Sequence, residues 1–399
     1  MPIIVYVLLG ATYVLALALL WREGLFESKR KMLAPALILL LIIAIRMLMF
    51  PHETYDYLDF LSPWVQFFRD NGGVRALGQS VGNYNPPYLY FLALFSYFDI
   101  SELYLIKLLS VLFDVLLAWA AMKLLSLYNK KRGLLLICFF AVLCLPTVAL
   151  NSAYWAQCDS IYVFFAVLSV YLVLSGKPVG SMISLAASFA FKLQAVFIIP
   201  AFFLFLLAGK LKPKHILVFP AAYIAFLLPP VLFGRPFFEV MTQYFSQAGT
   251  VGDGLNYNSP SLFSIFWNLD PAVWSRLAVI LAFALVLAVY IFAVINRKKL
   301  SDKLLLGLTL LLVIGIPFLL PHMHDRYFYL ADILSLVLAF TAPAFFPLPV
   351  FVQFASFLSY YAYLNMRYLL SPRIGGECML AALIITVVFT INSLKDKKE

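Results

Sequence analysis

Apolar runs long enough to cross a bilayer recur from one end of the chain to the other, each close to the ~20 residues that a transmembrane helix needs. Apolar residues make up 64% of the 399 and charged residues only 12%, against about 25% charged in an ordinary soluble domain. No soluble fold could bury this surface. We predict one all-α transmembrane domain over residues 1–399. Its candidate crossings lie near residues 2–21, 33–50, 103–126, 133–150, 157–176, 178–208, 214–233, 273–295, 303–321, 326–343, 347–364 and 377–393.

Two stretches are ambiguous by length, and the rule that basic loops face the cytoplasm decides both. The run from Pro86 to Phe98 is short and begins with two prolines. Crossing there would put the basic cluster 130–132 opposite the other basic clusters, so we place this run in the membrane interface. The run 178–208 is too long for one helix and has lysines beyond both ends. We expect it to cross twice, with a break at residues 191–194.

This topology gives about thirteen crossings, with the N-terminus outside and the C-terminus in the cytoplasm. Residues 51–102 form an outer loop with interfacial helices, and residues 234–272 form a second outer loop. The net charge of +10 is then a topology signal, and we expect no nucleic-acid partner. The basic clusters placed inside are residues 22–31, 130–132, 177, 210–214 and 297–303 and the tail Lys395, Lys397 and Lys398.

Most of the unusual polar residues fall at the outer surface under this topology. An Asp, Lys or Arg at membrane depth costs about 2.5–3.5 kcal/mol on insertion scales, so such residues face a bundle interior or a wet cavity. We predict that they share one cavity and form a functional site. The set comprises Asp56, Asp59, Asn85, Asn151 to Asp159, Lys192, Gln194, Asn256 to Ser261, His322, His324, Asp325 and Arg326.

Acidic residues open the first outer loop, directly after the second apolar run. Asp56 is the candidate general base, and Asp59 is a candidate substrate ligand that could instead cap a helix beginning near Pro63. Further along, Tyr84 and Asn85 precede two prolines, which block a helix and suit a shaped loop that contacts substrate. The alternative is that these aromatic and amide residues only anchor the loop at the membrane surface.

Two further groups combine polar side chains with apolar helices. Lys107 and Asp114 lie seven residues apart on one helical face, so they form a buried pair or separately meet other helices, and we favour a structural role. Trp155, Gln157 and Asp159 are predicted substrate ligands at the outer end of two helices. Asp159 requires a partner at this depth, and a cation from the basic group is the expected one.

Lys192, His322, His324 and Arg326 supply positive charge on the same face. Arg binds phosphate in a bidentate fork, and half-helices broken at Lys192 would aim backbone N–H groups into the cavity. The pattern indicates an anionic ligand. The histidines could alternatively bind a metal, but their spacing differs from a helical zinc motif and an arginine lies beside them. We therefore expect neither metal nor cofactor.

In this order, the acidic first loop, Tyr84-Asn85-Pro86-Pro87-Tyr88, Trp155-x-Gln157-x-Asp159, Lys192-x-Gln194 and His324-Asp325-Arg326 resemble the GT-C glycosyltransferases. The resemblance covers about residues 50 to 340. Within that class the chain is most similar to bacterial relatives of the GPI-anchor mannosyltransferases, and more distantly to the lumenal glucosyltransferases that extend the N-glycan precursor. The latter carry His-Glu-Lys where this chain has His324-Asp325-Arg326.

The resemblance implies inverting transfer of a mannose or glucose from a polyprenyl-phosphate-linked donor to a lipid- or polymer-linked glycan acceptor. Asp56 would be the base. Lys192, His322, His324 and Arg326 would bind the donor phosphate, with Gln194 on the donor side and Asn258 among the substrate ligands. It also implies a location in the inner, or plasma, membrane. The alternative functions are a transporter or flippase for a lipid-linked saccharide and, on the histidines alone, a metalloprotease.

Overall fold

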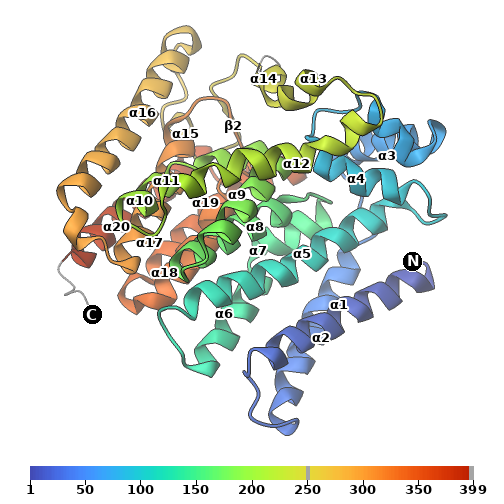
Figure 1. The fold of residues 1–399 in the computed structure, drawn as a ribbon, viewed down its shortest axis with the longest axis horizontal. Coiled ribbons are helices and arrows are strands. Elements are labelled where there is room, and N and C mark those ends of the chain that lie inside the picture. The colour runs from blue at the N-terminus through green and yellow to red at the C-terminus, as the bar shows by residue number, and fades with distance from the viewer. Residues whose placement is uncertain (249–251, 395–399) are drawn as a thin grey trace. The chain divides into compact units, whose positions relative to one another are not determined.

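The computed structural model describes residues 1–248 and 252–394, whose regular elements are helices apart from two strands of two residues each (Figure 1). This confirms the predicted all-α class. The predicted basic tail lies outside the described residues. The chain divides into two compact units, which are described separately. The first comprises Met1–Leu168, Ile183–Leu193 and Phe219–Thr250, and the second comprises Ser169–Met182, Gln194–Val218 and Val251–Glu399.

Eight helical segments in the described part of the chain are long and apolar enough to cross a membrane. In the most apolar stretch of the segment 271–295 only 22% of the residues are buried. In the corresponding stretch of the segment 213–232 only 11% are buried. Apolar helices exposed to this extent are typical of proteins whose surface contacts lipid. The eight segments contain α1 (Ile3–Arg22), α2 (Leu33–Met49), α5 (Glu102–Leu125), α11 with α12 (Pro213–Ile216, Val218–Leu232), α16 (Pro271–Ile295), α17 (Asp302–Leu319), α19 (Pro347–Asn365) and α20 (Pro372–Ser393).

The other predicted crossings are shorter or bent, so the predicted count of about thirteen is not confirmed. One is a pair of helices that meet at 52°, built from α6 (Arg132–Cys144), α7 (Pro146–Ala149) and a π-helical turn at Leu150–Tyr154. The break expected at residues 191–194 is confirmed, because α9 ends at Phe191 and a 3-10 helix begins at Leu193. The short apolar helices are α4 (Pro86–Phe95), α8 (Asp159–Leu174), α9 (Pro178–Phe191), the 3-10 helix Leu193–Phe197 with α10 (Ala201–Leu207), and α18 (Tyr329–Thr341).

Short elements occupy the two predicted outer loops and some of the helix junctions. Residues 51–102 contain a π-helical turn (Tyr57–Leu61), α3 (Ser62–Asp70), a 3-10 helix (Gly73–Gly78) and α4. Residues 234–272 contain α13 (Phe237–Met241), α14 (Gln243–Ala248), β1 (Asn256–Tyr257) and α15 (Leu262–Ile265). The remaining elements are β2 (Met323–His324) and the 3-10 turns Arg30–Met32, Arg297–Lys299 and Pro343–Phe345.

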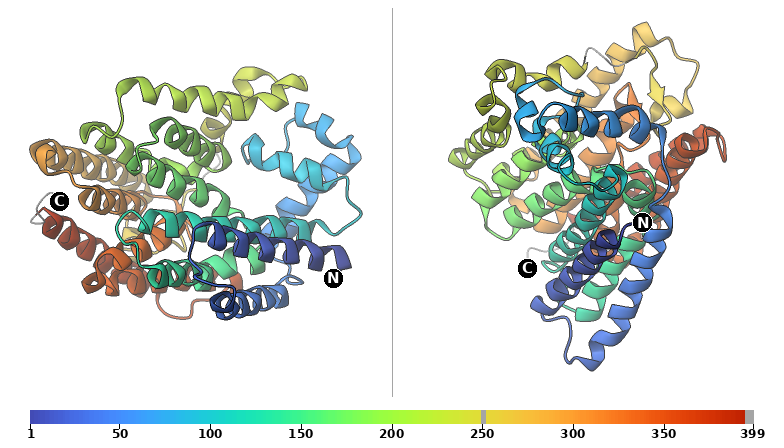
Figure 2. Two further views of the ribbon diagram at one scale, coloured as in Figure 1. Left: turned by 60° about the horizontal axis from the view of Figure 1, so that its bottom comes forward. Right: turned by 90° about the vertical axis from the view of Figure 1, so that its right-hand side faces the viewer.

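Helix α5 is the centre of the first unit. It packs against α1, α3, α4 and α6, and most of its side chains are buried. Helices α1 and α2 lie side by side, as the views in Figure 2 show, and α2 also contacts α6 and the π-helical turn Leu150–Tyr154. Elements from three distant parts of the sequence therefore meet around α5.

Helix α17 has the corresponding place in the second unit, where it packs against α10, α16, α18 and α20. Helix α19 packs on α18 and α20, and α15 lies on α20. The strands β1 and β2 pair in parallel, with Asn256 opposite Met323 and Tyr257 opposite His324. This pairing, which the hydropathy pattern did not predict, joins the loop before α15 to the loop before α18.

Proline explains both places where a helix changes pitch or direction near the predicted site. Proline has no backbone N–H and its ring clashes with the carbonyl four residues earlier. Pro63 accordingly follows a turn, Tyr57–Leu61, that is widened to π-helical geometry. Pro146 lies at the 52° bend after α6, because the residue before a proline avoids helical geometry.

Close packing of α20 on α15 depends on a glycine. A Cβ atom on Gly376 would lie 2.3 Å from Ser264 Oγ, 2.7 Å from Ile265 Cγ1 and 2.9 Å from the Ser261 carbonyl oxygen. These distances are well below van der Waals contact, and the carbonyl belongs to the backbone. The helices can therefore meet only if residue 376 has no side chain.

We predict that Gly376→Ala destabilises the protein by about 1–3 kcal/mol, because the added methyl group over-packs this contact. Thermal unfolding of the purified protein in detergent measures the effect. The control is Gly133→Ala in α6, where the added Cβ meets nothing within 4 Å and removing a helical glycine is neutral or slightly stabilising. Equal melting temperatures for the two variants would contradict this account of the α15–α20 contact.

Candidate functional site

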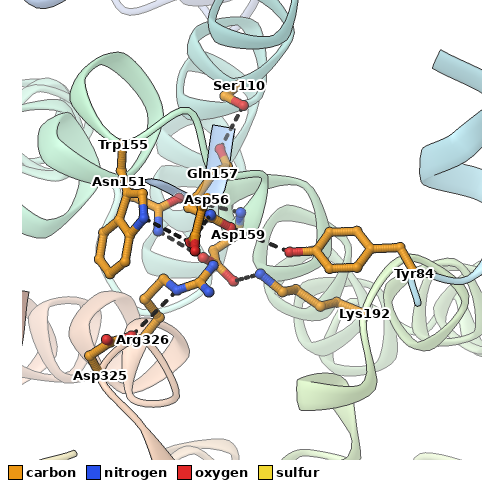
Figure 3. A network of polar contacts seen from close by, with 10 residues as sticks. All are labelled: Asp56, Tyr84, Ser110, Asn151, Trp155, Gln157, Asp159, Lys192, Asp325 and Arg326. Atoms are coloured by element: carbon orange, nitrogen blue, oxygen red, sulfur yellow. Dashed lines mark hydrogen bonds and ion pairs between the residues drawn. The ribbon is translucent and has the colours of Figure 1, made fainter. Parts of the chain in front are cut away.

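The carboxylate of Asp56 is the centre of a polar cluster in the first unit. Its Oδ2 atom accepts hydrogen bonds from the indole Nε1 of Trp155 at 2.9 Å and from the amide Nε2 of Gln157 at 2.6 Å (Figure 3). Trp155 and Gln157 are buried, whereas Asp56 is half-buried. Two N–H donors on buried side chains therefore fix the orientation of a carboxylate that remains accessible.

The turn that carries these two donors has an unusual backbone. Ala156, between Trp155 and Gln157, has a φ of +63°, in the left-handed region that few residues other than glycine adopt. Such strain costs of order 1–3 kcal/mol and persists only where the surroundings enforce it. Here the Gln157 N–H donates to the Asn151 carbonyl at 2.8 Å. The strained turn directs both side chains to the same carboxylate.

The loop between α2 and Asp56 is anchored at three points. The Lys107 ammonium on α5 donates to three carbonyl oxygens at the end of α2, and Thr54 Oγ1 donates to the Trp155 carbonyl at 3.0 Å. The His52 ring stacks on Tyr154 with centroids 3.7 Å apart. Burial, and after it the charge of Lys107, lowers the pKa of His52, so this ring stays uncharged in its stack. The carbonyls that Lys107 binds are those of Met49 at 3.1 Å, Phe50 at 3.0 Å and His52 at 2.6 Å.

Two more residues on the same face of α5 hold the other side of the cluster. Ser110 Oγ donates to the Gln157 carbonyl at 2.7 Å. Asp114 Oδ2 accepts from Ser152 Oγ at 2.5 Å and lies 3.3 Å from Arg46 Nη2 on α2. The sequence allowed Lys107 and Asp114 either to form a buried pair or to meet other helices separately, and the structure has the separate contacts. Lys107 binds carbonyl groups at the end of α2, whereas Asp114 binds Arg46 within α2 and Ser152, in the structural role that we favoured.

Asp159 at the start of α8 has the cationic partner that its depth requires. Its Oδ1 atom lies 2.5 Å from the Lys192 ammonium, and its Oδ2 accepts from Asn151 Nδ2 at 2.7 Å. All three side chains are buried. Lys192 lies between the end of α9 and the following 3-10 helix, so the helix break delivers the ammonium to Asp159.

Tyr84 connects the Asp56 group to the Lys192 group. Its hydroxyl donates to Gln157 Oε1 at 3.4 Å, and the Lys192 ammonium lies 5.6 Å from the centre of its ring. Its backbone carbonyl accepts from Gln243 Nε2 at 2.7 Å. The acidic and basic side chains thus belong to one continuous cluster (Figure 3).

Asn85 and Tyr88 form a buried wall beside this cluster. Asn85 Nδ2 donates to the Tyr223 hydroxyl at 3.2 Å, whereas in the described part of the chain its Oδ1 atom has no hydrogen-bond partner. The Tyr88 ring lies 5.3 Å from that of Tyr84. Burial raises the pKa of Tyr88 well above its ordinary value, so its hydroxyl stays neutral, and in the described part of the chain that hydroxyl has no hydrogen-bond partner.

The second unit brings together the other predicted site residues. Asn258 (φ +58°) forms an isolated bridge with His324, whose ring stacks on Tyr257 with centroids 4.8 Å apart. His322 (φ +61°) has its Nδ1 atom 2.7 Å from the Gly254 carbonyl oxygen. Arg326 Nε lies 3.4 Å from Asp325 Oδ1. Residues 254–258 and 322–326 are therefore one polar platform held by β1 and β2.

Two predicted site residues lie away from these contacts. Asp59 is exposed on the π-helical turn, and α3 begins without a side-chain cap, so the alternative that Asp59 caps that helix is wrong. Gln194 lies on the 3-10 helix after Lys192, in the second unit. The predicted meeting of Asp56 and Lys192 with Arg326 in one cavity stays a prediction.

A metal site was the alternative use of the histidines. Among residues 1–248 and 252–394, no group of three His, Cys, Asp or Glu side chains is arranged to hold a metal ion. The side chains of His322 and His324 also have different surroundings, because one contacts a backbone carbonyl and the other stacks on a tyrosine.

The sequence matches no model of a known protein family and no characterised protein. The functional assignment therefore depends on the residues of the site.

Sequence reasoning missed two residues of the cluster, Ser110 and Thr54. Ser110 lies three residues after Lys107, and this helical spacing was the available signal that both face the same neighbours. Thr54 carried no comparable signal, since a hydroxyl group at the end of an apolar run is compatible with many environments.

We predict that Lys107→Met destabilises the protein by about 2–4 kcal/mol, because it leaves carbonyl groups at the end of α2 without a donor. Lys123→Met on the same helix is the matched control. Lys123 forms a partly exposed ion pair with Glu23, and such pairs contribute about 0–1 kcal/mol. Thermal unfolding in detergent compares the stability of the two variants. Equal losses of stability would show that Lys107 does not anchor the loop.

Proposed function

We propose that the protein is a membrane glycosyltransferase of the GT-C type. It transfers a hexose, mannose or glucose, from a polyprenyl-phosphate-linked donor to a hydroxyl group of a lipid- or polymer-linked acceptor. The observation that carries the proposal is the oriented carboxylate of Asp56, which Gln157 and Tyr84 connect to the buried Lys192–Asp159 pair. A base and a fixed cation in one cluster suit the reaction of a hydroxyl with a phosphate ester.

In this mechanism Asp56 takes the proton from the acceptor hydroxyl as its oxygen attacks the anomeric carbon. The bond between that carbon and the phosphate oxygen breaks, and the electron pair leaves with the polyprenyl phosphate. Attack from the face opposite the phosphate inverts the anomeric configuration. Trp155 and Gln157 keep the carboxylate in position, because they donate to the same oxygen.

The leaving phosphate stays charged and needs fixed cations rather than a general acid. Arg326, His322 and His324 are the proposed phosphate ligands on the 322–326 loop, and Lys192 is the proposed ligand on the other loop. The Lys192 ammonium has three N–H donors, and Asp159 engages it through Oδ1, which fixes its direction. The scheme requires neither a metal nor a cofactor.

The remaining predicted ligands have matching chemistry. Asn85 offers a buried amide oxygen, and Asn258, Tyr84 and Gln194 offer hydroxyl or amide groups to sugar hydroxyls. Asp59, exposed beside Asp56, is proposed as a weaker substrate ligand. These groups suit a polyhydroxylated substrate.

We further propose about thirteen crossings of a plasma membrane, with the N-terminus and the site outside and the C-terminus in the cytoplasm. Eight long apolar segments, one bent pair and the shorter apolar helices other than α4, which we place in the membrane interface, are the candidates. On this topology the lipid donor and the acceptor would reach the site from the outer leaflet.

We predict that Asp56→Asn lowers the transfer rate by about 10²- to 10⁴-fold, the usual contribution of a general base. Asparagine keeps an acceptor oxygen for Trp155 and Gln157, so folding and donor binding should be retained. Asp59→Asn is the matched control and should keep most of the activity. Initial rates with a polyprenyl-phosphate hexose measure the effect. Wild-type rates for Asp56→Asn would remove this residue from the mechanism.

We predict that Arg326→Ala mainly raises the KM for the donor, by about 10- to 100-fold, because a charge-assisted hydrogen bond contributes about 1.5–3 kcal/mol. Arg326→Lys keeps the positive charge but not the bidentate fork, so its KM for the donor should rise less than that of Arg326→Ala. Steady-state kinetics at varied donor concentration separate the effect on KM from the effect on kcat. An unchanged KM in Arg326→Ala would exclude phosphate binding by this side chain.

A further inference from the structure

A cavity of about 510 Å³ lies in the second unit, beside the platform that carries His324. Its walls come from the segment 255–271, which leads into α16, and from the segment 368–373, which joins α19 to α20. Its volume is within the ~300–1,000 Å³ typical of small-molecule sites. None of the residues discussed in the Asp56 cluster lines it.

Part of the cavity wall belongs to a packed apolar cluster. Phe263 and Leu255 are buried in one wall and belong to a small apolar core with Ala278. The two sides are joined by a hydrogen bond of 3.0 Å from the Tyr368 hydroxyl to Asn258 Oδ1. Helix α15, whose residues Phe263 and Ser264 line the cavity, packs closely on α20 at Gly376. The cavity is therefore formed before any ligand binds.

The lining combines exposed aromatic faces with neutral polar groups. The exposed fraction is 78% for Trp267 and 58% for Tyr368, and both line the cavity together with Asn256 and Asn258. Among the described residues that line the cavity, Arg373 alone is charged, and it pairs with Glu377 at 2.7 Å. A sugar ring has an apolar C–H face that packs on an aromatic ring and hydroxyl groups that bind amides. The compensated charge favours such a neutral ligand over an anion.

The position of the cavity indicates its part in the reaction. Asn258, in its wall, forms a backbone bridge with His324. Asn256, also in the wall, pairs with Met323 in the adjoining strands. A ligand in the cavity is thus held next to the loop proposed to bind the donor phosphate, where the acceptor of a transferred sugar must approach.

We propose that this cavity binds the saccharide part of the acceptor, and that a sugar ring stacks on the Trp267 side chain. The inference rests on the proposed function, because only a transferase has an acceptor. It joins the predicted substrate ligand Asn258 to the segment 368–373, for which the sequence offered no functional motif.

Binding of disaccharides to the full-length protein in nanodiscs tests the proposal without any donor. The probes are α-1,2-mannobiose, maltose and cellobiose, measured by calorimetry. At least one should bind saturably, and Trp267→Ala should weaken it about tenfold or more. Trp267 is exposed, so its replacement should leave folding intact. The control is Trp21→Ala on α1, another exposed tryptophan, which should bind as the wild type does.

Three results would overturn the proposal. They are no saturable binding of any disaccharide, equal affinity of Trp267→Ala and wild type, or preferred binding of glycerol phosphate, which would make the cavity a lipid-headgroup site. In transfer assays the same variant should raise the acceptor KM with little change in kcat. Trp267-dependent saccharide binding without transfer by the wild type would support the saccharide site and refute the transferase.

Discussion

Three polar side chains on one face of a buried apolar helix hold the candidate site together. Lys107, Ser110 and Asp114 follow the helical repeat of α5, so they emerge in one line. Buried in this position, each must find hydrogen-bonding partners. Lys107 finds them at the end of α2, Ser110 at the Gln157 carbonyl, and Asp114 at Arg46 and Ser152. The need to satisfy these groups fixes the segments around Asp56.

The site residues lie where helices are interrupted. Asp56 precedes a π-helical turn, Asn151 lies within a second one, and Lys192 follows the end of α9. An unbroken apolar helix would turn such side chains toward lipid or toward a packed neighbour. Pro63, which follows the first turn, and Pro146, at the bend before the second, account for two of these interruptions. The same irregular backbone that weakens a transmembrane helix thus directs polar groups into one cluster.

Much of this arrangement could be predicted from the sequence. Long apolar runs required helices, and lysines beyond both ends of the run 178–208 located the break at Lys192. The cost of an isolated carboxylate required a cation for Asp159, and Lys192 is that cation. Hydropathy did not give helix lengths, however. Apolar composition continues through turns, so several predicted crossings are short helices such as α18.

Other features of the structure could not be predicted from the sequence, because they depend on contacts that only the fold creates. The left-handed turn at Ala156 is held by the nearby Asn151 carbonyl and by Thr54, which lies about 100 residues earlier in the chain. The pairing of Asn256–Tyr257 with Met323–His324 joins segments of two residues each, too short to show alternation. Asp59 resembles Asp56 in the sequence, and only folding separates the exposed carboxylate from the one that Trp155 and Gln157 hold.

The most direct test of this account is product formation by the purified wild-type protein. Radiolabelled polyprenyl-phosphate mannose or glucose would be incubated with the protein and a membrane lipid extract, and labelled products separated from the donor. A transferase yields label in a new glycosidic linkage whose anomeric configuration is opposite to that of the donor. Label that stays on the donor, or that only changes leaflet as a flippase would move it, would contradict the assignment.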